Sequence, residues 1–269
     1  MSNNIAQRYR YSIILLRQLV KVDFKLRYQG SVLGYMWSLL KPLFLFAILY
    51  TVFVKIVKIN YGTPHSSVYL LLGIVIWTFF SEITGGSVVS VVSKGDLIRK
   101  LNFPKYVIVL ATAFSALINL LLNLLVIALF IMLEKTSLSW TMLFVPALLL
   151  ELFVFSLGIG FFLSAAFVRL RDLGHIWDLV LTALFYATPI LFPITQAPPA
   201  LQKILILNPI AQVIQDLRYI VVSKDVATIT DVYAGNQFAR IIPVSIVVVV
   251  VIVSALFFKK KSKYFAEDI

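Results

Sequence analysis

The 269-residue sequence contains no cysteine and only two histidines. Without cysteine, the chain forms no disulfide, has no thiolate nucleophile and offers no thiolate ligand to a metal ion. His65 and His175 are far apart in the sequence, whereas histidine metal ligands usually lie a few residues from one another. We therefore expect that this chain binds no metal and no other cofactor.

Nucleotide-binding and catalytic motifs are also missing. A phosphate-binding loop follows the pattern GxxxxGK[ST], and the dipeptide Gly-Lys does not occur at all. No GxSxG elbow presents a serine nucleophile. Asp172 and Asp178 are six residues apart, so they do not share a helical face. We expect no catalytic residues and no ATPase cycle run by this chain alone.

Charged residues are scarce. They make up 13% of the chain, against about 25% in soluble domains, while 61% of the residues are hydrophobic. Six apolar stretches cover residues 34–57, 68–92, 106–133, 142–168, 174–192 and 240–258. A helix of about 20 apolar residues crosses a bilayer and satisfies its own backbone amides there. The sequence predicts an all-α membrane protein with six transmembrane helices in a single domain, residues 1–269.

Basic residues alternate between rich and poor connections. Of 24 Lys and Arg residues, 17 lie before or at the start of the first stretch, in the second and fourth loops, or after the last stretch. Cytoplasmic loops of membrane proteins carry such an excess. The pattern predicts a multi-pass protein of the cytoplasmic membrane with both termini in the cytoplasm. It also accounts for the net charge of +12 without a nucleic-acid partner.

Residues 8–28 are amphipathic rather than continuously apolar. Apolar residues recur at helical steps at positions 9, 13, 16, 20 and 24, and basic residues occupy another face at 10, 17, 21 and 25. This pattern predicts a helix in the membrane interface, with its bases toward anionic lipids. The spacing of Gly30 and Gly34 allows either a flexible elbow into the first span or close helix packing.

The loop at 93–105 is both basic and apolar. We expect Ser93 or Asp96 to cap a short helix, and Pro104 to stop it. Its apolar residues are Leu97, Ile98, Leu101 and Phe103. The loop is either a short interfacial turn or a helix that docks on a cytoplasmic partner.

The fifth stretch is short and is broken by Pro189 and Pro193. The apolar runs that follow, within 195–222, are each too short to span. They fit two re-entrant half-helices, which membrane proteins tolerate where the backbone packs against protein. A surface loop with two short helices is the alternative.

Polar groups within the apolar stretches are candidates for structural bonds or for a pore. Glu82 and Glu151 suit either role. Asn119 and Asn123 are expected to bond neighbouring helices. Tyr69, Trp77, Trp140 and Trp177 suit the interfacial belts. Because sugar rings stack on aromatic faces, the candidates for lining a glycan route are Tyr35, Trp37, Phe185, Tyr186 and Phe192, together with Glu82.

Several short motifs occur in a familiar order. They are Asp23-Phe-Lys-Leu-Arg-Tyr28, Ser31-Val-Leu-Gly34-Tyr-Met-Trp37, Pro42, Phe103-Pro104, Arg171-Asp172-Leu173, Thr188-Pro-Ile-Leu-Phe192, Asn208-Pro209, Arg218 and Tyr264-Phe-Ala-Glu267. In this order and spacing the chain resembles the ABC-2 type permeases of polysaccharide and teichoic acid exporters. The resemblance covers essentially the whole chain.

The resemblance implies a homodimer that works with two separate ATPase subunits, which bind the ATP and Mg²⁺. The loop at 93–105 would be the coupling helix, with Asp96, Leu97, Ile98, Leu101, Phe103 and Pro104 at the contact. The helix at 8–28 would gate access for a polyprenyl-phosphate-linked glycan, whose phosphate would meet Arg8, Arg10, Lys25 or Arg27. The half-helices at 195–222 would close the outer mouth.

Other classes of transporter or enzyme make different demands on the sequence. A permease for drugs or small lipids shares this architecture and differs in its substrate. A secondary transporter would have inverted repeats, and we find none. A membrane-embedded glycosyltransferase would have an acidic site on a cytoplasmic loop, whereas these loops are short and basic.

Overall fold

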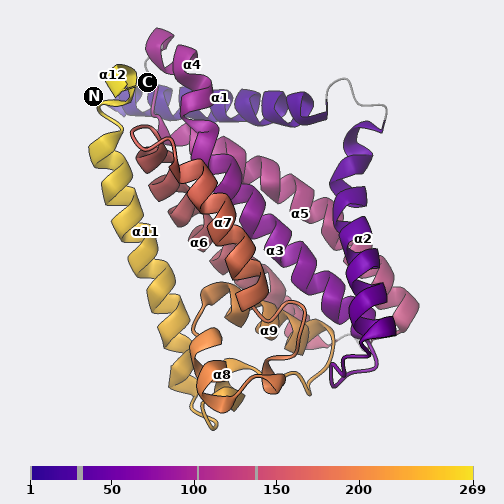
Figure 1. Ribbon diagram of the computed structural model, residues 1–269. Helices are drawn as coiled ribbons and strands as arrows, with labels where there is room; N and C mark the ends of the chain where they lie inside the picture. The colour runs from indigo at the N-terminus through magenta and orange to yellow at the C-terminus, as the bar shows by residue number, and fades with distance from the viewer. Residues whose placement is uncertain (1, 29–32, 102, 137–138, 269) are drawn as a thin grey trace.

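The computed structural model describes residues 2–28, 33–101, 103–136 and 139–268, apart from the side chains of residues 2–10, 24, 26–28 and 35. Its regular elements are all helices (Figure 1). Within the described ranges, five helices are long and apolar enough to cross a membrane: α2 (Trp37–Leu49) continued by the π-helical η2 (Tyr50–Ile56), α3 (Ser66–Ser90), α5 (Tyr106–Glu134), η4 (Trp140–Phe144) with α6 (Val145–Phe167), and η6 (Gln237–Arg240) with α11 (Ile241–Lys261). The predicted all-α membrane fold is confirmed.

The sixth apolar helix, α7 (Leu173–Ala187), is shorter than the predicted span 174–192. Its 15 residues rise roughly 22 Å, less than the hydrocarbon thickness of about 30 Å. The helix ends because Thr188 is extended, with φ −84° and ψ 139°, as a residue before proline prefers. Residues 188–193 continue without helical structure as far as η5 (Ile194–Gln196).

The predicted pair of short helices is present and is sharply bent. Helices α8 (Pro199–Leu205) and α9 (Pro209–Val221) meet at an angle of 100°. The side chain of Asn208 accepts a hydrogen bond from the amide of Ile210 at 3.1 Å and caps α9. Every residue from 209 to 218 is buried, so α9 is an interior helix and the surface-loop alternative is wrong. The chain then passes through α10 (Ile229–Val232) to the last span.

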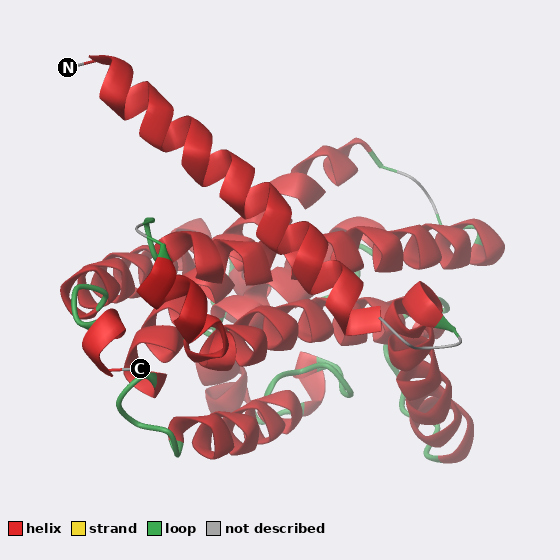
Figure 2. Ribbon diagram, turned by 90° about the horizontal axis from the view of Figure 1, so that it is seen from above, coloured by secondary structure: helices red, strands yellow, loops and turns green. Residues whose placement is uncertain are grey.

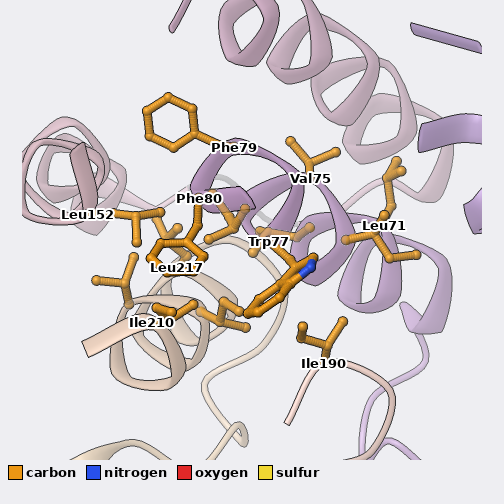
Figure 3. Packing of buried hydrophobic residues seen from close by; sticks show 14 of the residues in the cluster. Leu71, Val75, Trp77, Phe79, Phe80, Leu152, Ile190, Ile210 and Leu217 are labelled. Atoms are coloured by element: carbon orange, nitrogen blue, oxygen red, sulfur yellow. The ribbon is translucent and has the colours of Figure 1, made fainter. Parts of the chain in front are cut away.

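Helix α3 is the centre of the bundle. It packs on α5, α6, α7 and α9, and most of its side chains are buried. Figure 3 shows Phe80 beside Leu152 of α6 and Leu217 of α9, with Trp77 close by. Trp77 and Tyr69, both assigned above to the interfacial belts, lie in this core instead. Trp140 is almost fully exposed, as a belt residue would be.

Close packing of α6 against α3 depends on Gly160. A Cβ atom there would lie 2.6 Å from Ser87 Oγ and 3.0 Å from Ser87 Cβ. We expect Gly160→Ala to cost about 1–3 kcal/mol through overpacking. Gly85→Ala is the matched control, because its Cβ would meet Leu181 at an ordinary 3.8 Å. Thermal unfolding of both variants in detergent tests this, and equal unfolding temperatures would contradict it.

Helix α1 (Ser2–Tyr28) lies across the end of the bundle that carries both termini, as Figures 1 and 2 show. It begins six residues earlier than predicted and packs on α5. Leu19 is buried there, and Leu15, Leu16 and Val20 are partly buried. Ile13, expected on the same face, is 62% exposed. The helix therefore has two apolar faces, one toward the bundle and one away from it.

The elbow after α1 falls largely on residues 29–32, outside the described part of the chain. Gly34 within it has φ +48°, a left-handed conformation that favours glycine. A Cβ atom at Gly34 would meet nothing within 4 Å. The left-handed conformation and the open space beside its Cα favour the elbow over close packing at Gly34. Gly30 lies outside the described residues.

Candidate transport pathway and coupling surface

A polar stripe runs along one side of α3. Thr78, Ser81, Glu82 and Gly85 recur at helical spacing and are half-buried, while most of the helix is fully buried. Figure 1 shows α3 running between α2 and α7. Gly85 faces Leu181 of α7. The stripe is therefore the part of the central helix that its neighbours cover least.

Amide side chains tie this stripe to the neighbouring helices. Asn119 Nδ2 of α5 donates a hydrogen bond to Glu82 Oε2 at 2.9 Å. Asn123 Nδ2 donates to the carbonyl oxygen of Ser38 in α2 at 3.3 Å. The prediction that both asparagines bond neighbouring helices is confirmed. Glu82 takes part in a structural bond while its side chain stays half-exposed on the stripe.

The helices that flank the stripe are poorly covered. All of α7 is described and none of its side chains is buried. In α2 only Pro42 and Phe46 are buried. A half-exposed carboxylate in a membrane span is costly against lipid, and such groups normally face a bundle interior or a water-filled cavity. This side of the molecule is thus suited to a second protein surface or an aqueous pathway.

The aromatic candidates are spread along this side of the molecule. Trp37 opens α2 and is half-exposed, whereas Tyr186 near the far end of α7 is 65% exposed. Phe185 is half-buried and packs on Trp77, with ring centroids 5.7 Å apart. Phe192 is half-buried beyond the end of α7. The side chain of Tyr35 lies outside the described residues. The described candidates do not form one cluster.

Arg218 of α9 is fully buried, and its role was not foreseen from the sequence. Its guanidinium donates to the carbonyl oxygens of Tyr69 at 3.1 Å, Pro189 at 2.6 Å and Ile190 at 2.8 Å. It also lies over the Tyr69 ring, 3.6 Å from the centroid. The break after α7 leaves carbonyls without helical partners, and Arg218 satisfies them. One side chain therefore joins α9, α3 and the segment after α7.

Tyr61, in the connection between η2 and α3, completes this cluster. Its hydroxyl donates to the carbonyl oxygen of Leu191 at 2.9 Å, and its ring packs on Tyr69. Burial raises the pKa of Tyr61 to about 12, although the positive charge of Arg218 acts in the opposite direction. The phenol therefore remains protonated and a hydrogen-bond donor throughout the physiological pH range.

The loop at 93–105 forms η3 (Val92–Lys94) and α4 (Gly95–Lys100). The capping prediction was wrong: Lys94 is the N-cap and makes no side-chain cap, and Ser93 Oγ donates to the Ser90 carbonyl instead. Pro104 does not stop the helix either, because Leu101 is already extended. The start of this loop is thus held by a bond from Ser93 to a carbonyl oxygen at the end of α3.

Residues of the predicted coupling contact differ in how far they are buried. Ile98 and Phe103 are 4% and 3% exposed and pack inside the permease, so they hold α4 in place rather than present a surface. Leu97 and Pro104 are half-buried. The exposed side chains of this loop are Ser93, Asp96, Arg99, Lys100 and Leu101. A partner protein would meet the exposed group.

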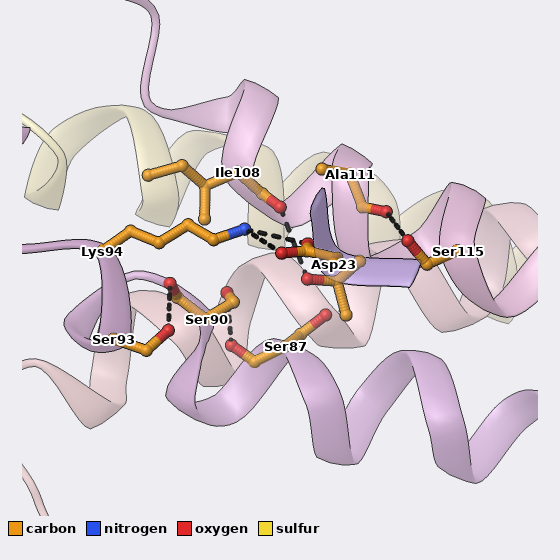
Figure 4. A network of polar contacts seen from close by, with 9 residues as sticks. Asp23, Ser87, Ser90, Ser93, Lys94, Ile108, Ala111 and Ser115 are labelled. Carbon is orange, nitrogen blue, oxygen red and sulfur yellow. Dashed lines mark hydrogen bonds and ion pairs between the residues drawn. The ribbon is translucent and has the colours of Figure 1, made fainter. Parts of the chain in front are cut away.

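Two ion pairs at this end join the start of α4 to α1, and the connection before α7 to the C-terminal segment. Lys94 Nζ lies 2.8 Å from both Oδ1 and Oδ2 of Asp23 in α1, as Figure 4 shows. Arg169 Nε lies 2.9 Å from Asp268 Oδ2 in α12 (Phe265–Asp268). The hydrogen bond and charge of Asp268 raise the pKa of Arg169. Segments far apart in sequence are thus held together around α4.

Of the four predicted phosphate contacts, the structure describes one side chain. Lys25 is exposed on α1, while the side chains of Arg8, Arg10 and Arg27 are not among those that the structure describes. Among the described residues, no three His, Cys, Asp or Glu side chains gather as a metal site would require. Glu151 is half-buried in α6.

Comparison with known proteins decides the family. Residues 14–222 match the model of the ABC-2 type transporter. The chain belongs to this family. It is 30% identical to the O-antigen export system permease protein RfbA of Myxococcus xanthus over 76% of this chain and 78% of that protein. It is 29% identical to the protein of the same name from Klebsiella pneumoniae over 81% and 84%. This ABC-2 protein is a multi-pass membrane protein, and its relatives are transport permease subunits.

Proposed function

We propose that this chain is the permease of an ABC exporter that moves a polyprenyl-phosphate-linked polysaccharide across the cytoplasmic membrane of a bacterium. The observation that carries the proposal is the similarity over most of the chain to permeases named for O-antigen export. The match to the ABC-2 type transporter model, residues 14–222, includes the loop that forms α4. O-antigen is the favoured cargo, with capsule or wall polymers such as teichoic acid as alternatives.

Two copies of the chain would form the pathway. The half-exposed stripe with Glu82 belongs to α3, which runs between the poorly covered helices α2 and α7. A second copy covering this side would enclose the stripe and remove it from lipid. The channel would then run between the copies, lined in part by Glu82, Phe185 and Tyr186. The re-entrant pair α8 and α9 would form its outer mouth.

Two ATPase subunits would supply the energy, because the sequence holds no phosphate-binding loop. ATP and Mg²⁺ would bind to those subunits. The excess of basic residues at the end with both termini supports a cytoplasmic location for that end. The ATPase would therefore dock there, against the exposed residues of α4.

Deletion of the gene tests the proposed function. We expect lipid-linked glycan to accumulate inside the deletion strain and surface polymer to return with the wild-type gene. Export of a small lipid or drug with unchanged surface glycan would favour the rival ABC-2 permease. Transport by the chain without any ATPase subunit would favour a secondary transporter.

Exposed residues of α4 are expected to bind the ATPase. Arg99→Glu with Leu101→Asp should lower ATPase copurification and glycan export at least about tenfold, the effect of losing a small interface hot spot. Lys203→Glu with Leu201→Asp makes the same chemical change on exposed residues of α8, at the opposite end, and should leave the ATPase bound. Normal copurification with the α4 variant would contradict the docking assignment.

The bases of α1 are expected to hold the substrate phosphate. Glutamine at positions 8, 10, 25 and 27 should lower export because charge-assisted bonds to phosphate are lost. A control variant carries glutamine at positions 17, 21, 259 and 260, which removes the same charge elsewhere at this end. Equal loss in both variants would assign these charges to membrane anchoring. Unchanged export from a correctly inserted first variant would refute the phosphate role.

A further inference from the structure

The ion pair between Asp23 and Lys94 connects the surface helix to the loop that forms α4. Lys94 Nζ lies 2.8 Å from each carboxylate oxygen, so both oxygens share one ammonium group. The two side chains are 18% and 24% exposed, which limits screening by water and salt. The residues are 71 positions apart in the chain. The pair is therefore a tertiary link between α1 and α4 rather than a local bond.

The positions of the two residues give this link a direction. Asp23 is on the last turns of α1, five residues before the helix ends and leads into the elbow and α2. Lys94 is the N-cap of α4 and directly precedes its exposed residues. A force applied to α4 thus reaches α1 close to the point where α1 joins the first span.

An apolar cluster supports the same connection. Leu19 of α1, Ile98 of α4 and Phe265 of α12 are all buried in the cluster that also contains the start of α5. Phe265 packs edge-on against Phe258 with ring centroids 5.5 Å apart. These apolar contacts hold α1, α4 and α12 together but do not determine the direction in which they move. The ion pair, in contrast, joins one residue of α1 to the residue that begins α4.

We propose that Asp23 and Lys94 form the link through which displacement of α4 by the ATPase moves α1. This inference rests on the proposed function. Both are positioning residues and contact neither substrate nor nucleotide. Movement of α1 would open access for the lipid-linked substrate. The link explains why α1, which is otherwise rich in basic residues, carries the acidic residue Asp23 on its side toward the bundle.

Charge replacement and exchange test the link in the complete complex of permease and ATPase. Asp23→Asn and Lys94→Met should each lower the glycan exported per ATP hydrolysed about tenfold, within the range of effects along coupling paths. The exchange Asp23→Lys with Lys94→Asp should restore most of it. Normal export from the single variants, or an exchange no better than either, would overturn the proposal. Glycan export by the wild-type complex in the same assay would show that the proposed function holds. A normal result for the single variants would then count against the link alone.

A covalent bridge gives a second test. Because the chain contains no cysteine, a thiol-specific reagent would react within the permease with the introduced cysteines alone. Asp23→Cys with Lys94→Cys should be uncoupled, and a short bismaleimide should then raise export per ATP at least about fivefold. The matched control is Arg169→Cys with Asp268→Cys, the other ion pair at this end, where bridging should give no gain. No gain from the 23–94 bridge, or arrest of export by it, would overturn the link.

Discussion

Replacing Arg218 with Met is expected to lower the unfolding temperature of the purified permease by about 10 °C or more. The substitution keeps most of the buried volume but leaves the carbonyl oxygens of Pro189 and Ile190 without their donor, and it removes a second bond from the helical carbonyl of Tyr69. Each unsatisfied buried group costs about 1–3 kcal/mol. The loss is therefore large enough to detach α9 from α3. Thermal unfolding in detergent, followed by size-exclusion chromatography, measures it.

Arg169→Met is the matched control, because this side chain is 54% exposed and its pair with Asp268 lies at the surface. Surface ion pairs contribute about 0–1 kcal/mol. Arg218→Lys should fall between the two, because a single ammonium cannot reproduce the planar arrangement of the guanidinium donors. An Arg218→Met variant as stable as the control would show that the carbonyls are satisfied in another way.

Gly73 of α3 lies against the same cluster, on the side opposite to α9. A Cβ atom there would lie 2.6 Å from Arg218 Nη2. The close approach of α3 to the guanidinium therefore requires glycine at this position. Among the described residues, the buried charge contacts neutral acceptors and an aromatic face, so its stability depends on this close fit.

The sequence predicted the features that depend on chain-local physics. Apolar length identified the long helices. Pro189 marked the end of α7, because the residue before a proline prefers an extended backbone. The bonds of Asn119 and Asn123 were also predicted, since an amide in a membrane span needs a polar partner.

Features that depend on the identity of a tertiary neighbour were missed. Arg218 is satisfied by backbone carbonyls, which every residue possesses, so no pattern of side chains points to its partners. Tyr69 and Trp77 have the composition of belt residues, but the neighbouring helices bury them. Ile13 shares the apolar period of α1, yet α5 covers only the other face. Periodicity shows which residues are apolar and not which neighbour covers them.

Replacing Glu82 with Leu is expected to lower glycan export at least about tenfold in a permease that still reaches the membrane and binds its ATPase. Two causes predict a loss. The Asn119 amide loses the carboxylate that accepts its bond at 2.9 Å, and the α3 stripe loses its charge. An unpaired buried amide costs about 1–3 kcal/mol. Export and unfolding temperature must therefore be measured on the same protein.

The double variant Glu82→Leu with Asn119→Leu separates these causes. Replacing both partners of a hydrogen bond by apolar groups costs less stability than replacing one, because this bond then leaves no donor unsatisfied. If Glu82 lines the pathway, the double variant should recover its unfolding temperature and remain defective in export. Recovery of export together with stability would instead assign Glu82 a purely structural role. Glu82→Gln keeps an acceptor for Asn119 but removes the charge, so its export measures how far the carboxylate's charge itself contributes.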